Sequence, residues 1–120
     1  MEYIFENDRP IYLQLVEKIR TQIVSGELKQ GEKIPSVREL ALIAKVNPNT
    51  VQKALAELED EGLIYTERTN GKFVTTNNKL VEETKRNIAK IKVEKYLNDM
   101  ESIGINYKEA LNYMQELGGK

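Results

Sequence analysis

Two residues, Lys45 and Val46, are all that separates two segments with helical patterns, and the second segment must begin at a fixed place. Pro48 suits the first position of a helix, where its missing N–H would have no partner, and it pushes Asn47 into the extended backbone that a helix cap requires. Asparagine is also a preferred cap residue. A connection this short between two helices predicts a helix-turn-helix.

The elements on both sides of this turn predict a complete small domain. Ser36 and Glu39 have the spacing of a capping box, and Asn70-Gly71 is a strong hairpin signal between two β-rich segments. Counting caps and stop residues, the expected elements are helices over 10–26, 36–44 and 47–62 and strands over 63–67 and 72–76. Three helices and a hairpin in this order predict a winged helix-turn-helix, in a fold that is mainly α with a small β-hairpin.

Residues 77–120 predict two further helices, with Gly104 as the break and Asn106 and Glu109 as an Asx version of the capping box. Their apolar faces are too small to form a core alone, so we expect a second copy of the chain to cover them. Three tyrosines are expected in this core or interface rather than at a ligand: Tyr96, Tyr107 and Tyr113. The predicted domains are therefore 1–76, which binds DNA, and 77–120, which dimerises.

Composition removes most catalytic and metal hypotheses. The 120 residues contain no cysteine and no histidine, so a disulfide framework, a thiolate metal site and the commonest general base are all missing. We expect no cofactor and no metal, and the sequence shows no carboxylate spacing that demands an enzyme. No stretch of about 18 apolar residues occurs, which predicts a protein of the cytoplasm without a membrane partner.

Charge is the main observation against a DNA-binding role. The chain has a net charge of −1, and residues 1–76 carry 10 Lys and Arg against 12 Asp and Glu, a balance of −2. This balance keeps open an alternative function, a winged-helix module that binds another protein and no DNA. Placement can override the total, because DNA affinity depends on which cations reach the phosphates.

Residues 10–74 carry motifs that resemble a known family. They are Pro10 and Tyr12, then Gly26, Leu28, Gly31, Lys33 to Ser36 and Arg38 to Ala41, then Asn49 to Val51, Ala54, Leu55, Leu58 and Glu61 to Ile64, and finally Gly71, Phe73 and Val74. This pattern resembles the DNA-binding domain of the GntR family of bacterial transcription regulators. The short C-terminal part is similar to that of the YtrA-like subfamily, which implies a small dimeric repressor, a pseudo-palindromic operator and a transporter operon as its target.

The resemblance and the chemistry of the side chains together give a set of DNA-binding candidates. Relatives use the start of the recognition helix for the major groove and the wing tip for the minor groove. Amide side chains can pair with adenine, and cations hold the DNA backbone. The candidates are Ser36, Arg38, Asn47, Pro48, Asn49, Thr50, Gln52, Lys53, Asn70, Gly71 and Lys72. Four acids lie at the far end of the same helix, away from the DNA: Glu57, Glu59, Asp60 and Glu61.

Each candidate also has an ordinary structural interpretation. Asn47-Pro48 could simply start a helix, the polar residues that follow could be a solvated face, and Arg38 could pair with Glu39 or a nearby acid. Asn70 to Lys72 could be a common hairpin tip. A small-molecule effector is compatible with the chain, but no site for one can be assigned. Taken together, the positions predict a sequence-specific, homodimeric DNA-binding transcription regulator, and the resemblance implies a repressor.

Overall fold

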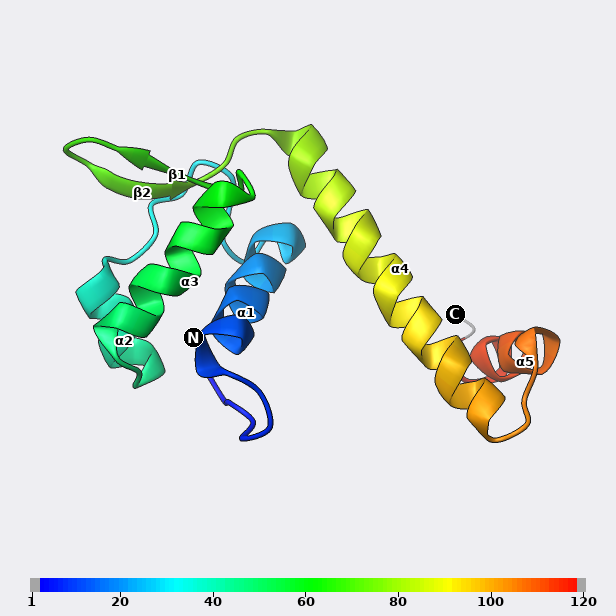
Figure 1. Ribbon diagram of the computed structural model, residues 1–120. Coiled ribbons are helices and arrows are strands. Elements are labelled where there is room, and N and C mark those ends of the chain that lie inside the picture. The colour runs from blue at the N-terminus through cyan, green and yellow to red at the C-terminus, as the bar shows by residue number, and fades with distance from the viewer. Residues whose placement is uncertain (1–2, 119–120) are drawn as a thin grey trace. The chain divides into compact units, whose positions relative to one another are not determined.

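The computed structural model describes residues 3–118 and contains five helices and one hairpin in that range (Figure 1). The elements are α1 (Ile11–Ser25), α2 (Val37–Ala44), α3 (Pro48–Asp60), β1 (Ile64–Glu67), β2 (Gly71–Val74), α4 (Asn78–Ser102) and α5 (Tyr107–Gly118). The predicted fold class is confirmed, because every expected helix and strand is present in the expected order. The chain forms two compact units, one ending at Thr84 and the other beginning at Lys85.

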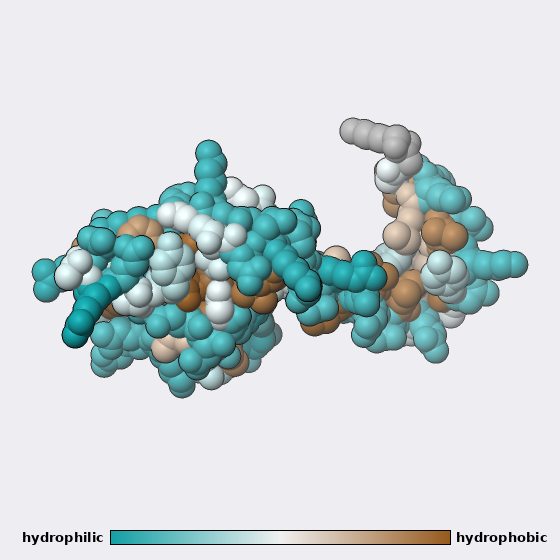
Figure 2. Space-filling model, turned by 90° about the horizontal axis from the view of Figure 1, so that it is seen from above, coloured by the Kyte–Doolittle hydropathy of each residue, from teal (hydrophilic) through white to brown (hydrophobic). Residues whose placement is uncertain are grey.

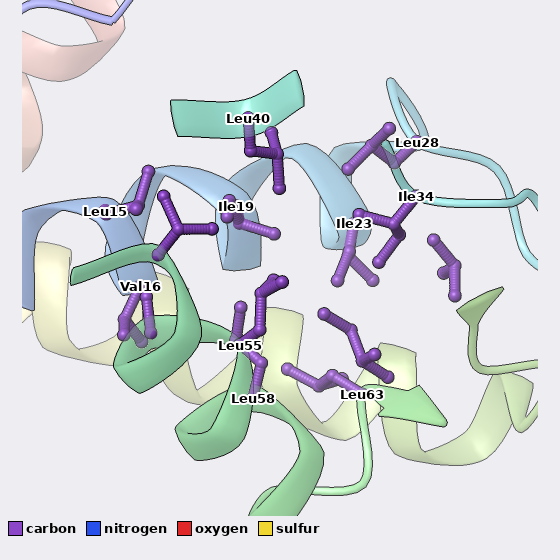
Figure 3. Close-up of a cluster of buried hydrophobic side chains, with 14 of the residues drawn as sticks. Leu15, Val16, Ile19, Ile23, Leu28, Ile34, Leu40, Leu55, Leu58 and Leu63 are labelled. Carbon is purple, nitrogen blue, oxygen red and sulfur yellow. The ribbon is translucent and has the colours of Figure 1, made fainter. Parts of the chain in front are cut away.

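The core of the first unit lies between α1, α2, α3 and the hairpin (Figure 3). Leu15 and Ile19 of α1 face Leu55 and Leu58 of α3, and all four are almost fully buried. These residues recur at helical spacing, so each helix buries one face and leaves the opposite face to solvent. Deleting a buried leucine side chain from such a core costs about 2–5 kcal/mol. The core therefore fixes α3 firmly in the domain.

The turn between α2 and α3 is set by caps at both helix starts. The Ser36 side chain accepts a hydrogen bond from the Glu39 N–H, and the Glu39 carboxylate accepts one from the Ser36 N–H, which confirms the capping box. At the end of α2, Lys45 adopts a left-handed conformation with φ of 58°, which is uncommon for a residue with a side chain. Asn47 then caps α3 through a hydrogen bond from the Asn49 N–H of 2.8 Å. The first turn of α3 is therefore held at one position.

The wing consists of three extended segments rather than two. β1 and β2 pair antiparallel with Thr66 opposite Lys72. On its other edge β2 pairs with the segment before α2, since the Ile34 N–H donates to the Lys72 carbonyl at 2.8 Å and the Val74 N–H donates to the Glu32 carbonyl at 2.9 Å. The wing is thus tied by backbone hydrogen bonds to the chain that enters α2.

The first unit also includes the first two turns of α4. Val81 is buried in the core of this unit, and the partly buried Leu80 packs against the same core. The compact unit therefore continues to Thr84, while the functional boundary expected after Thr76 stays a prediction. None of the helices in residues 3–118 has both the length and the apolar character needed to cross a membrane.

The second unit, residues 85–118 as described here, contains most of α4 and all of α5. Its α5 begins with the expected capping box, in which the Glu109 N–H donates to the Asn106 side chain at 3.0 Å. Within these residues Ala110 is the one buried side chain. Figure 2 shows hydrophobic residues exposed on this unit. The large apolar side chains with the most exposure are Ile91, Val93, Ile103, Tyr107, Leu111, Tyr113, Met114 and Leu117.

Candidate nucleic-acid interface

The N-terminal half of α3 presents a polar surface on a rigid support. Asn49, Gln52 and Lys53 are exposed, whereas Thr50 is partly buried. Asn47 and Pro48 are exposed as well; the side-chain oxygen Oδ1 of Asn47 accepts the cap hydrogen bond, and its NH₂ group has no partner among residues 3–118. Amide side chains can donate and accept hydrogen bonds at base edges. This helix surface therefore has the chemistry needed to read a base sequence.

Arg38 is an exposed cation in the first turn of α2. The alternative in which Arg38 pairs with Glu39 is not seen, because the Glu39 carboxylate accepts the Ser36 N–H at 3.0 Å. Hydrogen bonds from the backbone and side chain of Ser36 hold the pKa of Glu39 below its usual value. Within residues 3–118 the Arg38 guanidinium makes no ion pair and no hydrogen bond. Its charge is therefore available to an anion from outside.

A groove of about 400 Å³ lies between the wing tip and the start of α2. It brings together Ser36, Asn70, Gly71 and Lys72, which are far apart in the sequence and were predicted separately. The full lining is Lys33 to Val37, Glu39 and Thr69 to Lys72. The groove shows that the predicted wing residues and the α2 cap form one continuous surface of the first unit.

Lys72 does not point away from the protein, although it was predicted at the wing tip. Its ammonium is hydrogen-bonded to the Glu59 carboxylate and to the Thr66 hydroxyl, the latter at 2.9 Å. Hydrogen bonds from Lys72 and Thr66 hold the pKa of Glu59 below its usual value. The charge of Lys72 is thus neutralised inside the domain, and DNA contact by Lys72 remains a prediction.

Arg68 is an exposed cation at the wing tip and was not among the predicted DNA-binding residues. The hairpin loop has three residues, 68–70, because Glu67 pairs with Gly71 and the Asn70 N–H donates to the Glu67 carbonyl at 3.2 Å. Such loops combine a tight turn with a glycine at positive φ, and Gly71 has φ of 103°. The loop is centred on Thr69, so Asn70 and Gly71 lie at its C-terminal end and not at its centre, as their sequence had suggested. A three-residue loop that follows Glu67 includes Arg68, so predicting the correct loop length would have placed Arg68 at the wing tip.

Two of the four acids at the end of α3, Glu59 and Glu61, are paired with cations of the same domain, which reduces the negative charge that they present. Glu61 accepts two hydrogen bonds from Arg20 of α1, one of them 2.9 Å long, and Glu59 is bound to Lys72. Glu59 lies in the last turn of α3 and Glu61 is its C-cap residue, so both are at the opposite end from the capped N-terminus. The net charge of the whole chain is therefore a poor guide to this surface.

Replacing Gly71 with alanine tests the wing tip. A Cβ at this position would lie 3.2 Å from the Lys33 Cε atom, and φ of 103° is unfavourable for any L side chain. We expect a loss of about 1–2 kcal/mol in the free energy of unfolding, measured with urea, and weaker binding to duplex DNA.

Gly26→Ala is the matched control, because Gly26 also has positive φ but its Cβ would meet nothing within 4 Å. It should cost similar stability and leave DNA affinity unchanged. Equal DNA affinity of the Gly71 variant and the wild type would remove the wing tip from the DNA-binding surface.

This arrangement is that of a winged helix-turn-helix DNA-binding protein, with a capped recognition helix, a free arginine at the preceding helix and a glycine-turned wing. Residues 11–74 match the family described as "Bacterial regulatory proteins, gntR family". The chain belongs to this family, as its motifs led us to expect. It is a GntR-type DNA-binding transcription regulator and not an enzyme.

Relatives extend the similarity beyond the winged helix. The HTH-type transcriptional repressor YtrA of Bacillus subtilis (strain 168) is 37% identical over 117 residues, which cover 92% of this chain and 90% of YtrA. A solved GntR family transcriptional regulator from Listeria monocytogenes is 40% identical, with a TM-score of 0.88 over 94% of this chain and 99% of the other. The DNA-binding domain of AraR in complex with operator ORX1 is 31% identical, with a TM-score of 0.58 over 62% of this chain and 96% of the other.

Proposed function

We propose that this protein is a homodimeric repressor that binds a pseudo-palindromic operator. The observation that carries the proposal is the first half of α3, where the exposed amides of Asn49 and Gln52 and the exposed cation Lys53 lie on a helix whose start is fixed by a cap. YtrA, a relative over most of the chain, is named a repressor, and the AraR domain was solved on an operator. Both support a regulator that acts by occupying a DNA site.

Each winged helix would contact one half-site. Asn49 and Gln52 would read bases in the major groove, since amides pair with the edge of adenine. Ser36, Arg38 and Lys53 would bind phosphates and fix the register of the helix. The remaining candidates follow from position: Asn47, Pro48 and Thr50 at the helix start, and Asn70, Gly71 and Lys72 at the wing.

The second unit is the proposed dimerisation region. Among residues 85–118 only the side chain of Ala110 is buried, and it cannot stabilise two helices, because a unit this small needs a larger core or a partner. Between α4 and α5 lies an open, apolar groove of about 580 Å³ lined by Lys92, Val93, Tyr96, Tyr113, Met114, Leu117 and Gly118. We propose that the second copy covers this groove and the apolar residues around it. Two-fold symmetry would then place the half-sites about 34–36 Å apart.

The cellular setting follows from the proposed activity. The protein would act in the cytoplasm on chromosomal DNA, and the resemblance to the YtrA-like subfamily implies a transporter operon as its target. A small-molecule effector stays a prediction without an assigned site. The functional domains are proposed as 1–76 for DNA binding and 77–120 for assembly, although the compact N-terminal unit includes residues up to Thr84.

Selection of bound sequences from a random duplex library tests the proposal. The purified full chain at moderate salt should enrich one site with two-fold symmetry, and the enriched sequence can then be sought upstream of genes. Enrichment of an asymmetric site would contradict the dimeric mode. A folded protein that enriches nothing and shows no duplex affinity at low salt would support the protein–protein interaction module instead.

A further inference from the structure

The Lys53 ammonium lies on the face of the Tyr12 ring, 3.8 Å from the ring centroid. Tyr12 belongs to the first turn of α1, and Lys53 belongs to the second turn of α3, on the surface that carries Gln52. Tyr12 is partly buried, while Lys53 is exposed. An ammonium this close to the centre of an aromatic face is within the range of a cation–π interaction. The contact joins the recognition helix to the start of the chain's first helix.

The ring holds Lys53 without neutralising it. No carboxylate lies within ion-pair distance of the Lys53 ammonium among residues 3–118, whereas Lys72 is bound to Glu59. A carboxylate cancels the charge of a lysine, but an aromatic quadrupole leaves that charge in place. The positive charge of Lys53 is therefore not offset by a carboxylate among residues 3–118, and its contact with the ring reduces the side-chain freedom that binding a phosphate would cost.

We infer that Tyr12 is a positioning residue for DNA binding, which holds Lys53 ready to contact a backbone phosphate beside the recognition helix. This inference rests on the proposed function, because it requires α3 to face DNA. Tyr12 acts through its ring face and not through its hydroxyl group. The recognition surface thereby includes a contribution from α1, which packs against α3 in the core.

A double-mutant cycle separates positioning from a general structural role. Affinity of the full chain for its selected operator is measured by fluorescence anisotropy across a salt series. We expect Lys53→Gln to weaken binding and to lower the slope of log Kd against log salt by about 0.9 per half-site. Tyr12→Leu should weaken binding about two- to fivefold per half-site when Lys53 is present, and not at all in the Lys53→Gln background.

Two controls make the cycle specific. Tyr12→Phe keeps the ring face and should bind like the wild type, so an equal loss with phenylalanine and leucine would overturn the role of the ring. Lys29→Gln removes an exposed lysine from the connection before α2 and should leave the salt slope unchanged. Equal losses for Tyr12→Leu with and without Lys53, or no loss in either background, would also overturn the inference.

A measurement on the free protein distinguishes failure of the inference from failure of the proposed function. The Lys53 ε-methylene protons should resonate upfield from ring-current shielding in the wild type and in Tyr12→Phe, and should lose this shift in Tyr12→Leu. Absence of the shift, with operator binding intact, overturns the Tyr12–Lys53 contact alone. Presence of the shift in a protein that binds no duplex DNA overturns the proposed function, and the positioning role with it.

Discussion

A chain that ends at Thr84 is expected to bind operator DNA about a hundredfold or more weakly than the full protein. It keeps every member of the N-terminal hydrophobic cluster, including Val81, so the winged helix should still fold. It loses the proposed dimerisation region, and with it the gain of about 10² to 10⁴ that two linked binding sites provide. Sedimentation should show a monomer, circular dichroism a folded domain, and anisotropy the loss in affinity.

A point variant separates the loss of assembly from the loss of two helices. Met114→Lys places a charge in the apolar groove of the second unit, where Met114 is 46% exposed. It should shift the full chain toward monomer and weaken operator binding in parallel. Gln115→Lys adds the same charge at the neighbouring exposed position outside the groove lining and should do neither. A truncated chain that still sediments as a dimer would refute the assignment of the second unit.

Arg38→Ala should reduce operator affinity by about tenfold or more. A hydrogen bond to a charged group contributes about 1.5–3 kcal/mol, and a dimer would lose the contact at both half-sites. Stability should stay within about 0.5 kcal/mol of the wild type, because Arg38 is exposed and its guanidinium makes no hydrogen bond or ion pair among residues 3–118. A salt titration should show a slope lower by about 0.9 for each lost phosphate contact.

Two further variants sharpen the Arg38 experiment. Arg38→Lys should recover part of the affinity, because lysine keeps the charge but cannot form the paired hydrogen bonds of a guanidinium. Lys29→Ala removes one exposed positive charge outside the groove lining and should change binding little. If Arg38→Ala and the wild type bind equally across the salt range, Arg38 has no part in DNA binding.

Local signals were enough to predict the helices and the hairpin. The start of α3 is marked by the neighbouring residues Asn47 and Pro48, and the capping box of α2 by two residues three positions apart. Both can therefore be predicted from a short stretch of sequence. The first unit was also correctly expected to be a winged helix, because its element order leaves few alternatives. What the sequence predicted well are features whose physical cause lies within one turn or one cap.

Features that depend on distant residues were missed. The third extended segment of the wing requires Glu32 and Ile34 to meet β2, about forty residues later. The pairing of Lys72 with Glu59 depends on how β2 crosses the end of α3, which no spacing rule reports. The Tyr12–Lys53 contact likewise joins two helices that are adjacent only after folding. Three cations that look equivalent in the sequence therefore differ in the folded domain. Arg38 makes no ion pair among residues 3–118, Lys72 is paired with Glu59, and Lys53 lies on the ring of Tyr12.

The small core of the second unit has a consequence for how the protein responds to its own abundance. With Ala110 as the one buried side chain among residues 85–118, α5 has little to hold it in place in a single copy. Under the proposed assembly, ordering of these helices and pairing of two chains become one concentration-dependent event. The fraction of operator that is occupied would then depend on roughly the square of the monomer concentration. A modest fall in synthesis would therefore lower operator occupancy more steeply than it would for a monomeric repressor.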